Sequence, residues 1–513
     1  MQDKGFYVTT PIYYVNDVPH IGHAYSTVAA DAAARFNRLA GRKTLFLTGT
    51  DEHGQKVERA AAQRNLTPQE HCDRMVVPFK ELWKRLEISN DDFIRTTEER
   101  HIKAVQSIFQ KLYDQGDIYR GYYEGMYCVY EETFWPESQL VDGCCPECGR
   151  EVEWVKEESY YFKVSKYAPA LLDHIEKKPN FVQPDFRRNE VVSFLESGVT
   201  DVSVSRTTFK WGIPVPFDEK HVVYVWFDAL INYVTGAGYL NDPAKFAAFW
   251  PADFHIIGKD ILRFHAVIWP AMLMAAGIEL PKCVFAHGFW TIGGAKMSKS
   301  KGVVVDPNLL VDEFGADALR YFLLREVTFG LDGEFTHEAL VRRINDDLAN
   351  DLGNLVHRTI PMMKKYVGGR IPEAGDLSPL EEELKELATG CADSIEPLFA
   401  RLGFREALIE IWKVIRRANK YIDEAAPWAL HKAGDERRLA TVMNSLAEVI
   451  RIAAILVSPV MPQTAHKIWE QLGLSDFESQ RLDDAKVWGK LPAGAEVKEA
   501  KPLFPRIELD EQS

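Results

Sequence analysis

The 513-residue sequence has no uninterrupted apolar run of about 20 residues, the length that a membrane-spanning helix needs. Its start, Met1-Gln2-Asp3-Lys4, leads into a β-prone run and lacks the apolar stretch of a secretory signal. The seven cysteines are an odd number, and three of them crowd at Cys144, Cys145 and Cys148. This pattern argues against the disulfide framework of a secreted protein. We therefore expect a cytoplasmic protein that contacts no membrane.

An excess of basic residues is also absent, since 61 Lys and Arg against 75 Asp and Glu give a net charge of -14. Phosphate contacts dominate nucleic-acid binding, so this balance argues against such a partner. Net charge is a whole-chain average, however, and residues 401–420 carry six basic side chains against Glu406 and Glu410. A nucleic-acid partner stays open. The length predicts about two to four domains.

One short segment, residues 287–302, is rich in hydrogen-bond donors. It contains three lysines, two serines and four glycines around Lys296-Met297-Ser298-Lys299-Ser300. Ammonium and hydroxyl groups donate to anions, and glycines let the backbone approach a polyphosphate closely. Basic, glycine-rich loops are also common as solvated surface, so composition alone leaves both interpretations open.

A second segment lies near the amino terminus. Phe6–Thr10 predicts a strand, Pro11–His23 a loop, and apolar residues at Val28, Ala32, Phe36 and Leu39 a helix. His20 and His23 then lie where a strand ends and a helix begins, the usual ligand crevice of an open α/β sheet. Backbone N–H groups there favour phosphate, and Gly22 allows close approach. Alternatively, the two histidines cap the helix or bind a metal.

The His-x-Gly-His pattern and the Lys-Met-Ser-Lys-Ser loop, in this order, resemble the two signatures of class I aminoacyl-tRNA synthetases. The segments between and after them narrow the resemblance to the methionyl-tRNA synthetases, over nearly the whole chain. It implies an α/β fold: a Rossmann-type parallel sheet split by an inserted connective domain and followed by an α-helical bundle. The expected regions are the sheet's first half (1–118), the insertion (119–218), the second half (219–290), the lysine loop and linker (291–340), the anticodon-binding helices (341–475) and a C-terminal segment packing back on the body (476–513).

The resemblance assigns the chemistry of ATP to the two signatures. It implies catalytic roles for His20, His23, Lys296 and Lys299, with Mg2+ on the leaving pyrophosphate. ATP contacts are further expected from Gly22, Gly258, Lys259, Met297 and Ser298. For Gly258 and Lys259, a structural turn explains the sequence nearly as well.

A methionine pocket is implied next. Asp51 follows the strand-like run Thr44–Thr50 and matches the aspartate that holds the substrate's amino group, although a helix N-cap is an equally common role. Two aromatic-rich runs, Val222–Tyr233 and Phe254–Pro270, are expected to resume the sheet. The pocket residues implied by resemblance, which otherwise would be core, are Ile12, Tyr14, Trp226, Tyr233, Ile261, Phe264, His265 and Trp269. An aromatic cage with one or two polar hydrogens suits a thioether.

The insertion carries the pattern of half a zinc knuckle. Cys145-Pro146-Glu147-Cys148-Gly149 supplies two thiols, but the matching upstream segment is Cys128-Val129-Tyr130-Glu131, with glutamate at the second cysteine's place. The metal candidates are therefore Cys128, Cys145 and Cys148, completed by Cys144 or Glu131. The incomplete ligand set favours the alternative, a vestigial cluster whose cysteines hold no Zn2+.

In the helical region, Asn354, Arg358 and Trp428 occupy the positions of the family's anticodon-reading residues. An indole can stack on an unpaired base while Asn and Arg read base edges. Alone, Trp428 after Pro427 would be taken for a buried anchor.

The expected function is ligation of L-methionine to tRNA(Met), including the initiator, through methionyl-adenylate, with AMP and pyrophosphate released. A monomer is expected, because the family's appended dimerisation module is not seen after the helices. Two rivals are a nucleotidyltransferase that uses no tRNA and a non-catalytic tRNA-binding scaffold. The first leaves the helical third without a purpose, and the second leaves the histidine signature without one.

Overall fold

The computed structural model describes residues 4–130, 133–135, 137–293, 295–296 and 305–508. Its internal contacts divide the chain into two compact units, each assembled from separate stretches. The first comprises Met1–Pro19, Leu45–Trp83 and Asn90–His287, and the second comprises His20–Thr44, Lys84–Ser89 and Gly288–Ser513. The first strand and the helix that follows it therefore belong to different units.

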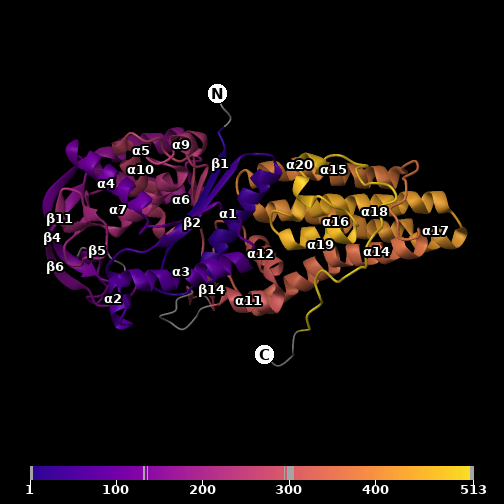
Figure 1. The fold of residues 1–513 in the computed structure, drawn as a ribbon, viewed down its shortest axis with the longest axis horizontal. Coiled ribbons are helices and arrows are strands. Elements are labelled where there is room, and N and C mark those ends of the chain that lie inside the picture. Colours follow the sequence, from indigo (N-terminus) through magenta and orange to yellow (C-terminus); the bar gives the residue numbers. More distant parts are fainter. Residues whose placement is uncertain (1–3, 131–132, 136, 294, 297–304, 509–513) are drawn as a thin grey trace. The chain divides into compact units, whose positions relative to one another are not determined.

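The first unit is built on a six-stranded sheet, shown in part by β1 and β2 in Figure 1. Its order is β3 (Asp92–Arg95), β2 (Thr44–Asp51), β1 (Phe6–Tyr14), β12 (Phe254–Gly258), β13 (Val284–His287) and β7 (Val182–Gln183). The pairs β1 with β12, β12 with β13, β13 with β7, and β2 with β3 are parallel. The predicted Rossmann-type sheet is confirmed.

Strand β1 is longer than the Phe6–Thr10 run that the sequence predicted. It continues through Pro11 to Tyr14, so Ile12 and Tyr14 lie on the strand and not in the loop. Proline is tolerated because the ladder to β12 is formed at Val8 and Thr9, before the residue that lacks an N–H.

Six helices of this unit share one hydrophobic core with the sheet. They are α4 (Glu99–Asp114), α5 (Val164–Lys177), α6 (Asp185–Glu196), α7 (Val225–Leu230), α8 (Asn232–Ala237) and α10 (Trp269–Ala276). The unit's other helices are α2 (Gln55–Gln63), α3 (Pro68–Arg85) and α9 (Pro243–Phe249). Tyr7, Phe109, Tyr233 and Trp269 are among the largest side chains fully buried in it.

Between β3 and β12 the chain adds two antiparallel sheets, as expected of an insertion. The four-stranded sheet has the order β5 (Thr133–Trp135), β4 (Ile118–Cys128), β6 (Glu153–Phe162), β8 (Val202–Ser203). The three-stranded sheet has the order β10 (Pro214–Val215), β11 (Asp218–Val223), β9 (Ser205–Arg206).

The prediction that Val222–Tyr233 resumes the parallel sheet is wrong. Only Val222 and Val223 are in a strand, the antiparallel β11, and the chain then forms α7 and α8. Nearly every residue of these helices is buried, the polar Asp228, Asn232 and Thr235 included, so the run lacks the exposed polar face of an amphipathic helix. Periodicity cannot separate such a helix from a buried strand, and the aromatic and β-branched residues favoured the wrong choice. After these helices the parallel sheet continues with β12, its edge strand β7 having been contributed earlier in the chain.

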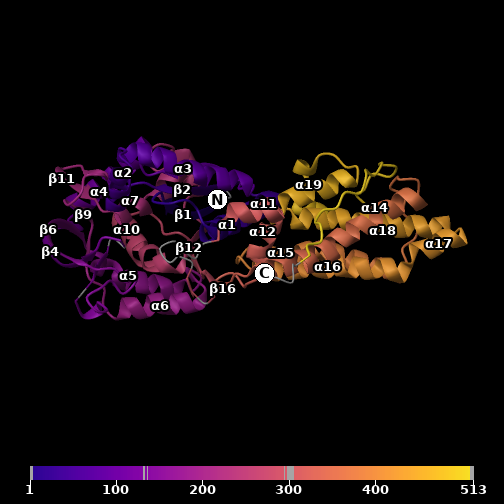
Figure 2. The ribbon, with the colours of Figure 1, turned by 90° about the horizontal axis from the view of Figure 1, so that it is seen from below.

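The second unit contains α1 (Ile21–Leu39), a small sheet and a helical bundle. The sheet has the order β15 (Ala295–Lys296), β14 (Trp290–Ile292), β16 (Gly333–Glu334). The helices are α11 (Pro307–Phe314), α12 (Ala316–Arg325), α13 (His337–Arg343), the π-helix η5 (Ile344–Gly353), α14 (Asn354–Tyr366), α15 (Pro379–Phe399), α16 (Phe404–Ala425), α17 (Pro427–Ala433), α18 (Glu436–Val457), α19 (Pro462–Gln471) and α20 (Leu482–Ala485). Figures 1 and 2 show α14, α16 and α18 running side by side, which confirms the predicted bundle.

The apolar character of helix α18 was not expected from the sequence. It has 22 residues and contains a window of mean hydropathy 1.7, which is long and apolar enough to cross a membrane by composition alone. However, 94% of that window is buried inside the protein. Its apolar surface is therefore covered by neighbouring helices, as in the core helix of a bundle.

A buried ion pair connects several segments of the second unit. Arg320 of α12 and Asp31 of α1 are both 0% exposed, and Nη2 of Arg320 lies 2.7 Å from Oδ2 of Asp31. The guanidinium also donates to the carbonyls of Leu86, Pro459 and Val460. Burial by itself raises the pKa of the Asp31 carboxyl, but the neighbouring arginines and Ser89 outweigh it and hold the pKa below its ordinary value.

Removing this guanidinium should destabilise the second unit. In Arg320→Ala, the Asp31 carboxylate stays buried without its strongest partner, and we expect the free energy of unfolding to fall by about 3–5 kcal/mol. Urea titration followed by circular dichroism measures the change. The control is Arg437→Ala, which breaks a pair whose side chains are 81% and 97% exposed and should cost at most about 1 kcal/mol. Equal losses in the two variants would contradict the assignment.

Candidate functional site

Tyr233 and His265, two of the predicted pocket residues, form a buried hydrogen bond. The hydroxyl of Tyr233 lies 2.7 Å from Nε2 of His265, and Nδ1 of His265 lies 3.0 Å from the carbonyl oxygen of Ile261. A carbonyl only accepts, so Nδ1 carries the proton and Nε2 accepts from the tyrosine hydroxyl. Burial lowers the pKa of His265 to about 4, so the ring is neutral at pH 7.

His255, the second residue of β12, completes this network, although the sequence did not assign it to the pocket. Its ring stacks on Tyr233 with centroids 4.1 Å apart. Nε2 accepts from the indole N–H of Trp269 at 3.2 Å, and Nδ1 therefore donates to the Thr9 hydroxyl at 2.8 Å. Burial lowers the pKa of His255 well below its ordinary value. The sequence signal for a pocket role of His255 was its position on the strand that precedes the predicted pocket helix.

Trp226 and Phe264 form the more accessible part of the predicted pocket. The two half-buried rings stack with centroids 4.0 Å apart and planes at 11°. Phe264 and His265 belong to the π-helical turn η3 (Phe264–Ile268), a local irregularity that is frequent at functional sites. Ile12 and Ile261 pack against the hydrophobic core of the first unit, whereas Tyr14 packs with Val15 and Cys72 in a separate cluster.

Asp51 ends β2 and is 2% exposed. It is not a helix N-cap, because α2 begins after Gly54, which makes no side-chain cap. Burial raises the pKa of the Tyr233 hydroxyl, and the charge of Asp51 raises it further. The Asp51 carboxylate is therefore near enough to the predicted pocket tyrosine to act on it electrostatically.

His20 and His23 form a reciprocal cap at the start of α1. Nδ1 of His20 accepts from the backbone N–H of Gly22, and Nδ1 of His23 accepts from the backbone N–H of His20, both at 3.1 Å. The rings stack 3.8 Å apart, and a Cβ on Gly22 would lie 2.9 Å from the His20 ring. The capping interpretation is therefore correct. Because both Nδ1 atoms accept, each neutral ring carries its proton on Nε2, a donor suited to a phosphate oxygen.

The lysine loop is only partly within the described residues. Lys296 follows Ala295 in β15, where it pairs with Thr291 of β14. Met297, Ser298 and Lys299 lie outside the described residues. Gly258 and Lys259, the other ATP candidates, are half-buried at the end of β12 and the start of a 3-10 turn.

The three anticodon candidates lie in the bundle of the second unit. Asn354 donates to the Oδ1 of Asn419 at 3.1 Å, and Arg358 pairs with Asp423 at 2.6 Å. Trp428 is 45% exposed on α17, so it is not the buried anchor that the sequence alone favours.

The basic segment of residues 401–420 is largely neutralised by the protein itself. Four of its six basic side chains pair with carboxylates: Lys413 with Glu410, Arg416 with Asp347 and Asp351, Arg417 with Glu383 and Glu424, and Lys420 with Glu424. It therefore gives little support to an RNA-binding stripe.

Comparison with known families decides the relationship. A family model described as "tRNA synthetases class I (M)" matches residues 6–153 and 149–360. This chain belongs to that family. A second model, the anticodon binding domain of methionyl tRNA ligase, matches residues 371–513 of this class I synthetase.

Individual relatives agree with both models. The synthetase is 54% identical to the methionine–tRNA ligase of Caldanaerobacter subterraneus subsp. tengcongensis, over 99% of this chain and 80% of the relative. It is 49% identical to the Bacillus subtilis enzyme of the same name, over 100% and 79%. A structure of Mycobacterium tuberculosis methionyl-tRNA synthetase in complex with methionyl-adenylate superposes with a TM-score of 0.94 at 46% identity, covering 98% of this chain and 100% of that one.

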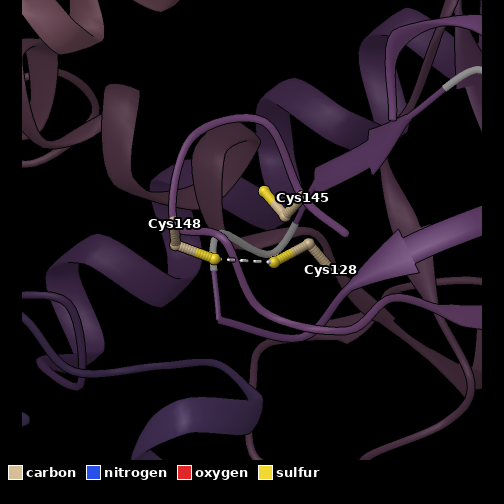
Figure 3. A group of neighbouring side chains, drawn as sticks. All are labelled: Cys128, Cys145 and Cys148. Carbon is tan, nitrogen blue, oxygen red and sulfur yellow. Dashed lines mark hydrogen bonds between the residues drawn. The ribbon is translucent and has the colours of Figure 1, made fainter. Parts of the chain in front are cut away.

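The insertion of this synthetase brings three of the predicted metal-ligand candidates together. The sulfurs of Cys128, Cys145 and Cys148 all lie within 4.8 Å of one another, and Cys128 and Cys148 face each other at 3.5 Å (Figure 3). The turn is closed by a hydrogen bond from Gly149 N–H to the Cys145 carbonyl, with Gly149 at φ +70. Three thiols in this arrangement fit three corners of a tetrahedral Zn2+ site. Cys144 is not part of the group, and Glu131 lies outside the described residues.

A second group of metal-binding character, Glu158, Asp218 and His221, is explained by contacts within the protein. Glu158 pairs with Arg120, Asp218 accepts from the Tyr160 hydroxyl, and Nδ1 of the buried His221 lies 3.0 Å from the Ser205 hydroxyl. These partners join β6, β9 and β11, so the group connects the two antiparallel sheets.

The neutral state of His265 predicts a pH dependence of stability. The unfolded chain binds a proton at His265 near pH 6.5, whereas the folded protein does so only at about 4, so stability falls as pH drops through this window. The loss reaches about 3 kcal/mol, because one pKa unit corresponds to about 1.4 kcal/mol. In His265→Gln this contribution is absent, and urea unfolding of both proteins between pH 6.5 and 4 measures the difference. Parallel pH profiles would contradict it.

Proposed function

We propose that this synthetase activates L-methionine with ATP and transfers it from methionyl-adenylate to tRNA(Met), including the initiator, in the cytoplasm. The proposal rests on one observation above the others: a methionine-type catalytic model and a methionyl anticodon-binding model match the two successive parts of one chain. AMP and pyrophosphate are the other products. A carboxylate is already ionised at neutral pH, so the first step needs alignment and charge stabilisation but no general base.

The ammonium group of methionine would be bound by charge, and its side chain by the shape of an apolar pocket. Asp51 would receive the ammonium group, and the side chain would enter the group formed by Ile12, Tyr14, Trp226, Tyr233, Ile261, Phe264, His265 and Trp269. The polar hydrogens of Tyr233 and His265 are already donated within the protein. A thioether needs few hydrogen bonds, whereas the polar groups of another side chain of similar length would lack hydrogen-bond partners in this pocket. Selectivity then comes from the rejection of polar substrates.

ATP is held by donors from both signatures. The Nε2–H groups of His20 and His23 are assigned to the phosphate region, with Gly22, Gly258 and Lys259 at the nucleotide. Lys296 and Lys299, with Met297 and Ser298 between them, would stabilise negative charge on the polyphosphate in the transition state. Mg2+, when bound, neutralises the leaving pyrophosphate.

The tRNA anticodon is assigned to the bundle. Trp428 offers an exposed indole face for stacking on an unpaired base, while Asn354 and Arg358 would exchange their present partners for base edges. Since catalytic and anticodon-binding regions lie in one chain, a monomer suffices for the reaction.

A structural Zn2+ is proposed for the insertion. Cys128, Cys145 and Cys148 would hold it as thiolates, and the grouping of their sulfurs within 4.8 Å supports this. Its role would be to stabilise the fold of the insertion.

Methionine-dependent exchange of pyrophosphate into ATP tests the reaction, and Lys299→Gln tests the lysine loop. We expect the variant to lower kcat of exchange by about 100-fold or more, because a donor to the transition state is lost. The Kd for methionine, measured by calorimetry without ATP, should stay within about twofold of the unmodified protein. Exchange at the original rate would remove Lys299 from the mechanism, and absence of exchange in the unmodified protein would refute the function.

Trp428→Ala separates tRNA recognition from adenylation. Loss of one base stack, worth about 1–3 kcal/mol, should raise KM for tRNA about 10- to 100-fold. Pyrophosphate exchange should be unaffected. The matched control is Trp154→Ala, which removes an indole that is 61% exposed in the insertion. If both variants charge tRNA equally well, Trp428 does not stack on the anticodon.

A further inference from the structure

Asp228 is a fully buried carboxylate held between two imidazoles. It lies in α7 at 0% exposure, with Oδ2 2.6 Å from Nδ1 of His53 and Oδ1 2.7 Å from Nε2 of His101. An ionised carboxylate only accepts, so both imidazole nitrogens donate. Burial by itself raises the pKa of Asp228, but the two histidines outweigh it and hold the pKa below its ordinary value. The Asp228 carboxylate is charged, and each of its two oxygens accepts a hydrogen bond from a different segment of the chain.

His53 and Asp228 each lie two residues from a predicted methionine contact. His53 follows Asp51 by two residues, on the segment that leaves β2. Trp226, which stacks on Phe264, precedes Asp228 by two residues on α7. The bond from His53 to Asp228 therefore ties the ammonium-binding segment to the helix that carries one wall of the side-chain pocket.

The segment that carries Asp51 is fixed on its other side by Glu52. This carboxylate is 0% exposed and accepts from Thr50, Arg95 and Thr97 at 2.6–2.7 Å. The Glu52 carbonyl accepts from the indole N–H of Trp211 at 2.5 Å. Toward α7, the neighbouring His53 forms a direct side-chain bond to Asp228.

We propose that Asp228 is a positioning residue for methionine, which sets the distance between the ammonium site at Asp51 and the aromatic wall at Trp226 through its bond to His53. His101 of α4 holds the second carboxylate oxygen and so fixes the plane of the group. This inference rests on the proposed function of the site. Asp228 itself touches no substrate in this assignment.

A carboxylate accepts from both imidazoles at once. Asparagine at position 228 would present one acceptor oxygen and one NH2 donor group to two imidazole N–H donors, so one histidine would face a donor or would have to move its proton to its other ring nitrogen. A buried donor without an acceptor is unfavourable, and the segment of His53 or the helix of His101 would have to move. A shift at His53 reaches Asp51 directly, whereas ATP is assigned to other residues.

Pyrophosphate exchange and calorimetry with methionine alone test the proposal. We expect Asp228→Asn to raise KM and Kd for methionine about 10- to 100-fold, while KM for ATP stays within about threefold. His53→Ala should likewise raise KM and Kd for methionine while the KM for ATP stays nearly unchanged. His53→Asn should recover most of the affinity, because the asparagine amide can donate from nearly the place of Nδ1.

Each remaining outcome has a defined meaning. Unchanged methionine affinity in folded Asp228→Asn, equal losses of methionine and ATP affinity, or equal impairment in His53→Ala and His53→Asn would each overturn the proposal. If Asp228→Asn does not fold, the comparison of the two His53 variants decides. If the unmodified protein shows no methionine-dependent exchange, the proposed function fails instead, which is a separate result.

Discussion

The ion pair between Asp31 and Arg320 is the constraint on which the second unit depends. Both side chains are 0% exposed, and the guanidinium is shared among α1, the residue Leu86 and the turn between α18 and α19. A buried charge must be paired to be tolerated, so these segments have to meet around the guanidinium for the unit to be stable. Phe36 of α1 adds a stacked contact with Phe399 of α15 at 4.1 Å. Helix α1, which carries the two signature histidines, is thereby held to the bundle within one unit.

In the first unit, burial decides which groups are charged and which are neutral. His255 and His265 are neutral because burial lowers the pKa of both, at His265 more than the Ile261 carbonyl and the charge of Asp260 raise it, and each then has one donating and one accepting nitrogen. That fixes the direction of the hydrogen bonds from Trp269 and Tyr233. Asp228 stays charged because two donors surround it. The region around the predicted pocket is thus ordered by hydrogen bonds that have only one consistent direction.

The sequence predicted the parts of the fold that local patterns encode. The strand before the histidines, the apolar face of α1, the strand before Asp51 and the helical character of the bundle all follow from periodicity and composition. Val222–Tyr233 was misread because nearly all of its residues are buried, the polar Asp228 and Asn232 included, so no exposed polar face reveals the helical period. The pairs Asp31–Arg320 and His53–Asp228 join residues 289 and 175 positions apart. Their partners cannot be deduced from spacing, and His255 was not assigned to the pocket because a histidine within a buried strand looks like core.

The histidine signature shows why a structural and a functional interpretation need not compete. Capping consumes the Nδ1 lone pairs of His20 and His23, and this fixes the tautomer in which Nε2 carries the proton. A neutral imidazole that was not used as a cap could place its proton on either nitrogen. The glycine between the histidines is required by the same geometry, because a Cβ there would collide with the His20 ring. The cap thus prepares two donors at the positive end of a helix dipole, where an anion is favoured. Helix capping, usually taken as evidence for a purely structural role, is here the feature that would make the pair effective toward phosphate.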